Sequence, residues 1–201
     1  MKDEIQNILL AGVGGQGTLL ASELLSEALL LAGYDVKKSE IHGMSQRGGS
    51  VTSHVRYGSK VLSPLIHEGR ADILFGFELL ETYRYLPMLR ANGTVFVNSQ
   101  RILPAPVAVG AASYPRELED KLRSVCPNTH FIDGLTLARQ AGHPRTVNMV
   151  LLGALSTALE MPSVLWCDVI AEKVPQQFLQ ENILAFQLGR DCQTRLKETT
   201  S

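Results

Sequence analysis

A glycine-rich turn between an apolar run and a helical pattern constrains the fold of this chain more than any other feature. Residues 8–11 (ILLA) are all apolar, which predicts a buried strand. Residues 12–17 (GVGGQG) follow as a tight turn. From residue 18 to residue 32 apolar side chains recur at helical spacing, and Gly33 is placed to end that helix. A second strand at residues 34–38 completes a predicted βαβ unit.

The rest of the chain alternates between strand patterns and helix patterns. We expect further strands at residues 71–77, 94–98 and 129–133, and further helices at residues 79–89, 115–125, 135–141, 147–160, 163–173 and 175–192. Residues 102–110 contain two prolines and suggest edge structure. The polar residues from 194 onward are expected to fray.

One segment is expected to form a β-hairpin. Residues 51–57 alternate and carry β-branched side chains, Gly58-Ser59 make a turn, and Val61-Leu62 return. Strands that alternate with helices favour an α/β fold, here a three-layer α/β/α Rossmann-like domain with a mostly parallel sheet. The hairpin makes that sheet mixed.

Length and composition favour one globular domain. The 201 residues suit a single domain, residues 1–201, with a core of about residues 5–192. Hydrophobic residues make up 45% and charged residues 19%, which argues against a disordered chain. The net charge of -1 gives no basic footprint for nucleic acid. No apolar stretch is long enough for a bilayer and no signal-peptide pattern precedes the first strand, so we expect a soluble cytoplasmic protein with no membrane contact.

The residue types that usually carry catalysis are sparse. Cys126, Cys167 and Cys192 lie far apart, and an iron–sulfur cluster takes four thiolates, so this chain alone cannot hold one. The five histidines show no metal-ligand spacing. No arrangement of a nucleophile with a base is evident. We therefore predict no catalytic residue and no metal site in this chain.

Two other polar residues are expected to have mainly structural roles. Asp133 follows a predicted strand and is placed to cap the next helix. Asn148 lies inside an apolar helix pattern, where its amide would fasten a loop or contact a partner.

The glycine turn allows three interpretations. Gly12, Gly14 and Gly17 fit the pattern G-x-G-x-x-G, in which glycines let a phosphate approach the N–H groups of a helix N-terminus. An NAD site also needs an acidic residue at the end of the second strand, where Lys37 and Lys38 would suit a phosphate better than a ribose diol. An NAD site, another phosphate contact, and a structural turn packed on a partner subunit are all consistent with the pattern.

A second loop-like segment spans residues 40–51 (EIHGMSQRGGSV). It is rich in glycine and polar groups, and Arg47 beside Gly48 and Gly49 would bind a phosphate or carboxylate. The segment follows the second strand, so we expect it on the same sheet edge as the glycine turn, where open α/β sheets bind ligands. A solvated surface loop is the alternative.

These motifs together resemble a known family. Residues 12–17 with residues 46–49 (QRGG) are similar to the gamma subunits of 2-oxoacid:ferredoxin oxidoreductases, the pyruvate/ketoisovalerate oxidoreductase gamma family. Residues 40–49 resemble in particular the beta subunit of indolepyruvate ferredoxin oxidoreductase. Residues 148–155 (NMVLLGAL) are similar to a late helix of the family, and residues 174–186 to its C-terminal region.

The resemblance implies a role within an assembly. The family decarboxylates a 2-oxoacid on thiamine diphosphate, passes electrons through iron–sulfur clusters to ferredoxin, and transfers the acyl group to coenzyme A. Thiamine and clusters belong to other subunits, so this chain is expected to hold no redox cofactor and to pack on a thiamine-binding large or alpha-type subunit; a homodimer is possible for the isolated chain. The predicted coenzyme A-binding residues are Gly12, Gly14, Gly15, Gln16, Gly17, Lys37, Ser45, Gln46, Arg47 and Gly48.

Two competing functions are kept beside this one. The first is a stand-alone NAD-binding Rossmann oxidoreductase, which would hold a nicotinamide tightly. The second is a purely structural interaction subunit, whose glycine turn would be covered by a partner and would contact no ligand.

Overall fold

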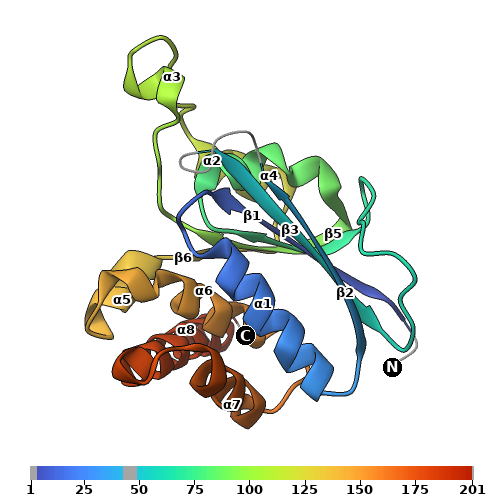
Figure 1. Cartoon of the computed structure of the whole chain (residues 1–201). Helices are drawn as coiled ribbons and strands as arrows, with labels where there is room; N and C mark the ends of the chain where they lie inside the picture. Colours follow the sequence, from blue (N-terminus) through green and yellow to red (C-terminus); the bar gives the residue numbers. More distant parts are fainter. Residues whose placement is uncertain (1–3, 43–48, 201) are drawn as a thin grey trace.

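The computed structural model describes residues 4–42 and 49–200 (Figure 1). In this part of the chain one sheet of six strands is formed in the order β2-β3-β1-β4-β5-β6. The strands are β1 (Gln6–Val13), β2 (Asp35–His42), β3 (Ser50–Gly58), β4 (Ala71–Gly76), β5 (Leu89–Asn98) and β6 (Thr129–Ile132). β1, β4, β5 and β6 run parallel, and β3 runs antiparallel to both β1 and β2.

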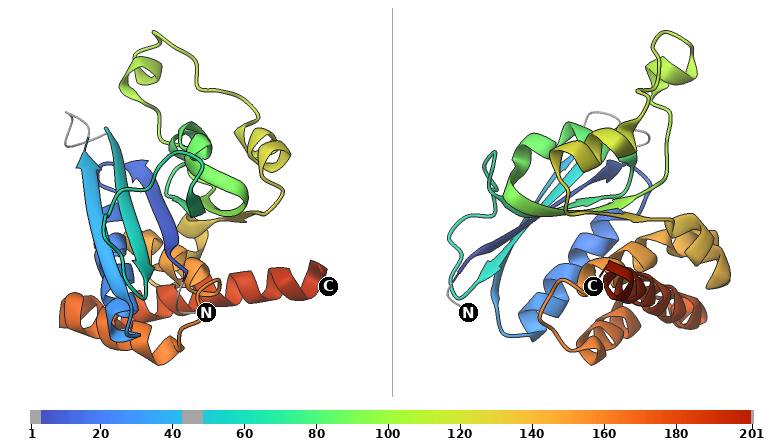
Figure 2. Two further views of the ribbon diagram at one scale, coloured as in Figure 1. Left: turned by 90° about the vertical axis from the view of Figure 1, so that its right-hand side faces the viewer. Right: turned by 180° about the vertical axis from the view of Figure 1, so that it is seen from behind.

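Helices cover both faces of this sheet, which confirms the predicted three-layer α/β/α fold (Figures 1 and 2). One face carries α1 (Thr18–Leu31), α5 (Gly134–Gln140), α6 (Val147–Ser156), α7 (Ser163–Lys173) and α8 (Leu179–Thr200). The other face carries α2 (Leu79–Arg84) and α4 (Leu118–Val125). A short helix, α3 (Ala105–Ala108), stands away from both layers. Single 3₁₀ turns lie at η1 (Leu86–Met88), η2 (Pro144–Thr146) and η3 (Gln176–Phe178).

The apolar run of β1 is explained by its place in the middle of the sheet. Ile8 and Leu10 pack into the core under α1 and α6, while Leu9 and Ala11 pack into the core under α2 and α4. All four side chains are fully buried, as expected for a strand covered by helices on both faces. Burial of each large side chain contributes about 1.5–3 kcal/mol to stability. The end of β1 is thereby a rigid base for the glycine turn that follows.

The predicted hairpin of residues 51–57 with residues 61–62 is wrong, because β3 pairs with β2 and with β1. Residues 51–58 of β3 pair with residues 35–42 of β2. Val61 is instead buried in a loop, where its N–H donates to the carboxylate of Asp35 at 2.7 Å. Leu62 is 86% exposed and pairs with no strand. The sheet is mixed as predicted, because β3 inserts between β1 and β2.

Several element boundaries also differ from the sequence expectation. β2 extends to His42, because residues 39–42 stay paired with β3. β5 begins at Leu89, earlier than predicted, and its first part is irregular, since Asn92 has a φ of 61° and the pairing with β4 shifts register there. The predicted helix at residues 79–89 stops at Arg84, close to Pro87. Residues 102–110 do not join the sheet edge and instead contain α3. The polar tail does not fray, since α8 continues to Thr200.

The length and apolar character of the helices show whether any of them could span a membrane. Among the residues that the structure describes, no helix is both long enough and apolar enough to cross a bilayer.

Candidate functional site

The glycine turn lies at the carboxyl edge of the sheet, between β1 and α1. The side chain of Gln16 folds back across it, and its Oε1 accepts a hydrogen bond from the N–H of Val13 at 2.8 Å. The Nε2 of the same side chain donates to the main-chain carbonyl of Phe77 at 2.8 Å. Gln16 therefore connects the turn after β1 to the segment after β4 through hydrogen bonds.

Gly17 is the N-cap of α1 and has a backbone that only glycine adopts readily. Its φ is 77°, in the left-handed region. A Cβ at this position would lie 2.8 Å from the Nδ2 atom of Asn148, on α6. Asn148 is buried. Its predicted role of fastening a loop is consistent with this contact, which seats the glycine turn on a second helix.

The N–H groups of the turn are only partly engaged. Gly14 donates to the carbonyl of Gly49 at 2.9 Å, and Gln16 donates to the carbonyl of Val13 at 3.2 Å. The first hydrogen bond of α1 runs from Ala21 to Gly17, so the N–H groups of Thr18, Leu19 and Leu20 have no partner within the helix. This is the positive end of the helix dipole, and Gly15 beside it is exposed. Such a terminus can accept an oxyanion.

The second predicted loop begins and ends beside this turn. Val13 pairs with Ser50, and β2 ends opposite the same stretch of β3, with His42 against Val51. The hydrogen bond from Gly14 to Gly49 joins the two segments directly. The expectation that both loops share one sheet edge is therefore confirmed at these ends. The predicted binding residues Ser45, Gln46, Arg47 and Gly48 lie outside the described residues.

Lys37 lies at the other end of the sheet. It pairs with Arg56, which pairs in turn with Asn7 near the start of β1. Six residues of strand separate Asn7 from Val13, which corresponds to roughly 20 Å. Lys37 forms an ion pair with Asp35. The structure thus brings Gly12, Gly14, Gly15, Gln16 and Gly17 together and does not bring Lys37 to them.

Neighbouring polar side chains connect the remaining strand ends of this edge. Asn98, fully buried at the end of β5, donates to the carbonyl of Phe77 at 3.2 Å and accepts from the N–H of Gly134 at 3.2 Å. Gln100 accepts from Asn98 at 3.2 Å and from Gln16 at 3.4 Å. We did not single out Asn98 or Gln100 from the sequence. The available signal was a polar residue directly after a strand that is expected to be parallel.

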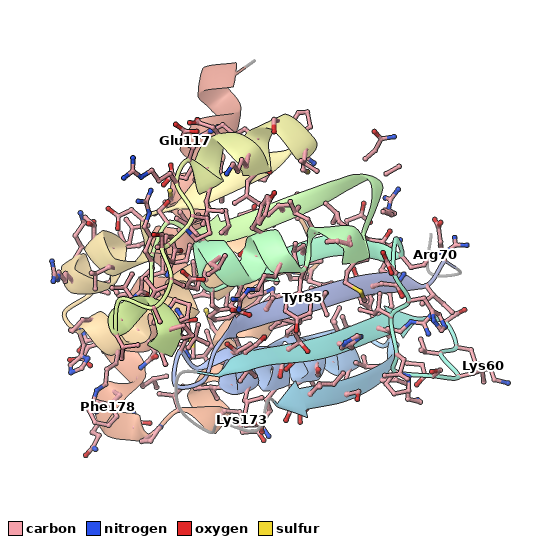
Figure 3. The ribbon with its side chains drawn as sticks, turned by 90° about the horizontal axis from the view of Figure 1, so that it is seen from above. Lys60, Arg70, Tyr85, Glu117, Lys173 and Phe178 are labelled. Atoms are coloured by element: carbon pink, nitrogen blue, oxygen red, sulfur yellow. The ribbon has the colours of Figure 1, made fainter. Side chains whose placement is uncertain are left out.

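A pocket of about 250 Å³ adjoins the glycine turn through Asn148. Its apolar side includes Leu20 and Phe178, and its cationic groups are Arg145 and Lys173; Lys173 and Phe178 lie on the same side of the molecule in Figure 3. Lys173 sits 3.4 and 3.5 Å from the carboxylates of Glu23 and Glu27, which offset its charge. Arg145 is exposed and forms no ion pair with a carboxylate among the described residues. Arg145 is therefore the cation best placed to meet an anion here.

The candidate acidic and thiol groups do not assemble into a reaction centre. Asp133 caps α5 as predicted, since its Oδ1 accepts from the N–H of Thr136 at 3.1 Å. Cys126, Cys167 and Cys192 form no disulfide bond within the described residues. Within the described residues no group of three or more histidine, cysteine or acidic side chains is arranged to hold a metal ion. What the site offers is a helix N-terminus whose chemistry suits an anion, with cationic side chains nearby.

Comparisons with known proteins agree with one another. Residues 7–192 match the family model described as pyruvate ferredoxin/flavodoxin oxidoreductase. The chain is 43% identical over 189 residues to indolepyruvate oxidoreductase subunit IorB of Pyrococcus horikoshii, and the match covers 91% of this chain and 93% of that protein.

Solved structures show the same fold. The gamma subunit of a keto/oxoacid ferredoxin oxidoreductase from Geobacter sulfurreducens is similar with a TM-score of 0.69 and 22% identity, over 94% of this chain and 99% of that chain. The 2-oxoglutarate:ferredoxin oxidoreductase of Magnetococcus marinus is similar with a TM-score of 0.73 and 20% identity, over 96% of this chain and 32% of that chain.

Proposed function

Because this chain belongs to the pyruvate ferredoxin/flavodoxin oxidoreductase family, we propose that it is the cytoplasmic small subunit of an indolepyruvate-type 2-oxoacid:ferredoxin oxidoreductase and helps to bind coenzyme A. The observation that carries the proposal is the glycine turn at the start of α1, where N–H groups have no partner within the helix and the hydrogen bond from Gly14 to Gly49 joins the turn to the start of β3. The substrate, indolepyruvate or a related arylpyruvate, is taken from the name of the Pyrococcus horikoshii relative.

The proposed ligand is chosen for its chemistry. Coenzyme A carries several phosphate oxyanions, which suit a helix N-terminus and arginine side chains. The solved structure from Magnetococcus marinus is described with coenzyme A bound. In our proposal the N–H groups of the glycine turn and Arg47 hold phosphate oxygens, and Arg145 takes the place that the sequence had suggested for Lys37.

The proposed division of labour leaves bond-making chemistry to a partner subunit. Thiamine diphosphate, when bound there, supplies the carbanion chemistry of decarboxylation, and iron–sulfur clusters carry the electrons to ferredoxin. The three cysteines of this chain are too few for the four thiolates of a cluster. This chain's own residues bind and orient the acyl acceptor, so the isolated chain is expected to be inactive.

The strand order argues against the NAD-binding alternative. In a dinucleotide-binding fold the second strand lies next to the first, so that an acidic residue at its end reaches the ribose. Here β3 lies between β1 and β2, which places the end of β2 two strand spacings, roughly 10 Å, from β1. The nearby carboxylate of Glu40 forms an ion pair with Lys38 at 2.9 Å.

A purely structural subunit is the second candidate, and it differs from our proposal in lacking any effect on coenzyme A kinetics.

The assembled enzyme provides the test. Loss of a charge-assisted contact costs about 1.5–3 kcal/mol, so Arg47→Ala should raise KM for coenzyme A roughly 10- to 150-fold. The KM for the oxoacid should change little. Arg70→Ala is the control, since exposed Arg70 immediately precedes β4 at the opposite sheet edge. Unchanged coenzyme A kinetics in Arg47→Ala would favour the purely structural subunit.

A further inference from the structure

A second feature of the carboxyl edge is a projecting segment without charge. Residues 102–112 (ILPAPVAVGAA) carry no charged or polar side chain, and they contain α3. All views show this segment standing clear of the two helical layers (Figures 1 and 2). Leu103 is 56% exposed and Val109 is 78% exposed. We call residues 102–112 the apolar arm.

The exposed apolar residues of the arm are contiguous in the sequence. Single apolar side chains on a surface need no explanation, but a contiguous exposed apolar segment marks an interaction site. The arm also has internal order, since the N–H groups of Ala111 and Ala112 donate to the carbonyl of Pro106 at 2.8 and 3.1 Å. A short helix and two prolines limit its freedom in the unbound state. The arm is therefore a preformed element.

One buried carboxylate holds both ends of the arm. Glu78 is 1% exposed, and its Oε1 accepts from the N–H of Ile102 at 3.1 Å and from the hydroxyl of Tyr114 at 2.6 Å. Its Oε2 accepts from the N–H of Glu81 and caps α2 at 2.8 Å. Burial and the Glu78 hydrogen bond raise the pKa of Tyr114, so the phenol stays protonated as a donor. Glu78 thus fixes the direction of the arm relative to the sheet.

The base of the arm is continuous with the glycine turn. Gln100, two residues before the arm, accepts from Gln16 at 3.4 Å, and its carbonyl accepts from the N–H of Leu79 at 3.1 Å. A partner that covers the glycine turn therefore lies beside the arm. In the Magnetococcus marinus enzyme the region similar to this chain makes up 32% of a longer chain, so there it is covalently joined to further polypeptide. The nearness of the arm to the glycine turn and the longer chain of the Magnetococcus marinus enzyme favour a partner subunit, and not a second copy of this chain, as the protein that covers the arm.

We propose that the apolar arm docks in an apolar groove of the thiamine-binding subunit, and that Glu78 and Tyr114 act as positioning residues that hold it ready. This inference rests on the proposed function, since that function supplies the partner. It goes beyond it by assigning the contact to residues 102–112, which the coenzyme A contacts do not use. Docking would also set the position of the glycine turn against the partner, through Gln100 and Gln16.

The test is co-purification of tagged full-length chain with the thiamine-binding subunit. The double variant Leu103→Asp/Val109→Asp introduces two charges into the arm and should reduce the co-purified partner at least tenfold. Leu62→Asp is the matched control, because Leu62 is 86% exposed but lies in the loop after β3. It should bind as the unchanged chain does. Circular dichroism and Tm should be alike for all three chains, because the substituted side chains are exposed.

A second variant separates docking from arm positioning. Tyr114→Phe removes the hydroxyl that meets Glu78 and keeps the ring, so it should slow association with the partner while leaving the apolar surface in place. Equal co-purification and equal association rates for all variants would overturn the arm proposal and leave the proposed function standing. Failure of the unchanged chain to bind the partner would overturn both. A self-associated chain that becomes monomeric only in Leu103→Asp/Val109→Asp would identify a second copy as the occupant and overturn the proposal.

Discussion

Gln16 and Asn98 donate to the same acceptor, the main-chain carbonyl of Phe77, at 2.8 and 3.2 Å. They come from the ends of β1 and β5, and the carbonyl belongs to the segment that follows β4 between them. Three neighbouring strand ends are therefore cross-linked through side-chain amides. These hydrogen bonds connect the carboxyl edge of the sheet through neutral side chains alone.

The first prediction concerns this amide network. Gln16→Ala removes the bonds to Val13 and Phe77 and should lower the free energy of unfolding by about 1–3 kcal/mol, since a partly buried carbonyl and N–H lose their partners. Urea unfolding measures the change. Gln187→Ala is the control, because exposed Gln187 bonds only to Asp191 one turn along α8. Its effect should stay below about 0.5 kcal/mol. Equal losses in both variants would mean that the network adds no stability.

How much of this edge was predictable depends on the range of the interactions. The strand, turn and helix around Gly12 to Gly17 follow from a local pattern, and their order was predicted correctly. The partner of β3 was not, because strand pairing depends on residues far apart in the chain. The same limit affected Lys37, whose distance from the glycine turn follows only from the pairing register.

The arm shows a different limit. Pro104 and Pro106 suggested edge structure for residues 102–110, and this was wrong, because the segment contains a projecting helical turn and joins no sheet. The direction of the arm is set by Glu78, and its bonds to Ile102 and Tyr114 span 24 and 36 residues of sequence. No local pattern reports such contacts.

The second prediction separates the cost of a positive φ from the cost of a steric contact at the glycine turn. Gly15→Ala and Gly17→Ala both place a side chain at positive φ, which costs about 1–2 kcal/mol. Only Gly17 has a neighbour in the way, since a Cβ at Gly15 meets nothing within 4 Å. Gly17→Ala should therefore destabilise the fold more than Gly15→Ala in urea unfolding. Adding Asn148→Ala should reduce the cost of Gly17→Ala toward that of Gly15→Ala, and a cost independent of residue 148 would refute the contact.

The third prediction concerns pH. Burial lowers the pKa of His54 below its ordinary value of 6.5, and its Nδ1 accepts from the N–H of Ile66 at 3.1 Å. Well above pH 6.5 the imidazole is neutral in both the folded and the unfolded state, so His54 causes no change in the free energy of unfolding with pH there. As pH falls below 6.5 the unfolded chain takes up a proton that the folded chain does not, and the free energy of unfolding decreases.

The variant His54→Asn tests this directly. An asparagine has an amide oxygen that can accept from Ile66, and it does not titrate, so the decrease in stability between pH 6.5 and about pH 5 should be smaller. Urea unfolding at several pH values measures the slope. The control His67→Asn removes an exposed histidine from the loop that contains Ile66, and it should leave the slope unchanged. A slope that is equal in the unchanged chain and His54→Asn would rule out His54 as its source.

The fourth prediction tests which cationic side chain, Arg145 or Lys37, contacts coenzyme A. Arg145 lines the pocket beside Asn148 and is exposed without an ion pair among the described residues, whereas Lys37 pairs with Asp35 at the far end of the sheet. In the assembled enzyme Arg145→Ala should raise KM for coenzyme A about tenfold, and Lys37→Ala should leave it unchanged. The main-chain N–H of Arg145 donates to Nδ1 of His143 at 3.1 Å, and alanine keeps that bond.

Steady-state kinetics with the oxoacid at saturation measure both values. Because the backbone at residue 145 is retained, kcat and KM for the oxoacid should be alike in both variants. A change confined to KM for coenzyme A would then result from loss of the Arg145 charge at the pocket. An increased KM for coenzyme A in Lys37→Ala instead would mean that the ligand binds near the start of β2, roughly 20 Å along the sheet from the glycine turn. The anion would then lie on the β2 side and not against α1, and the pocket beside Asn148 would have no part in binding.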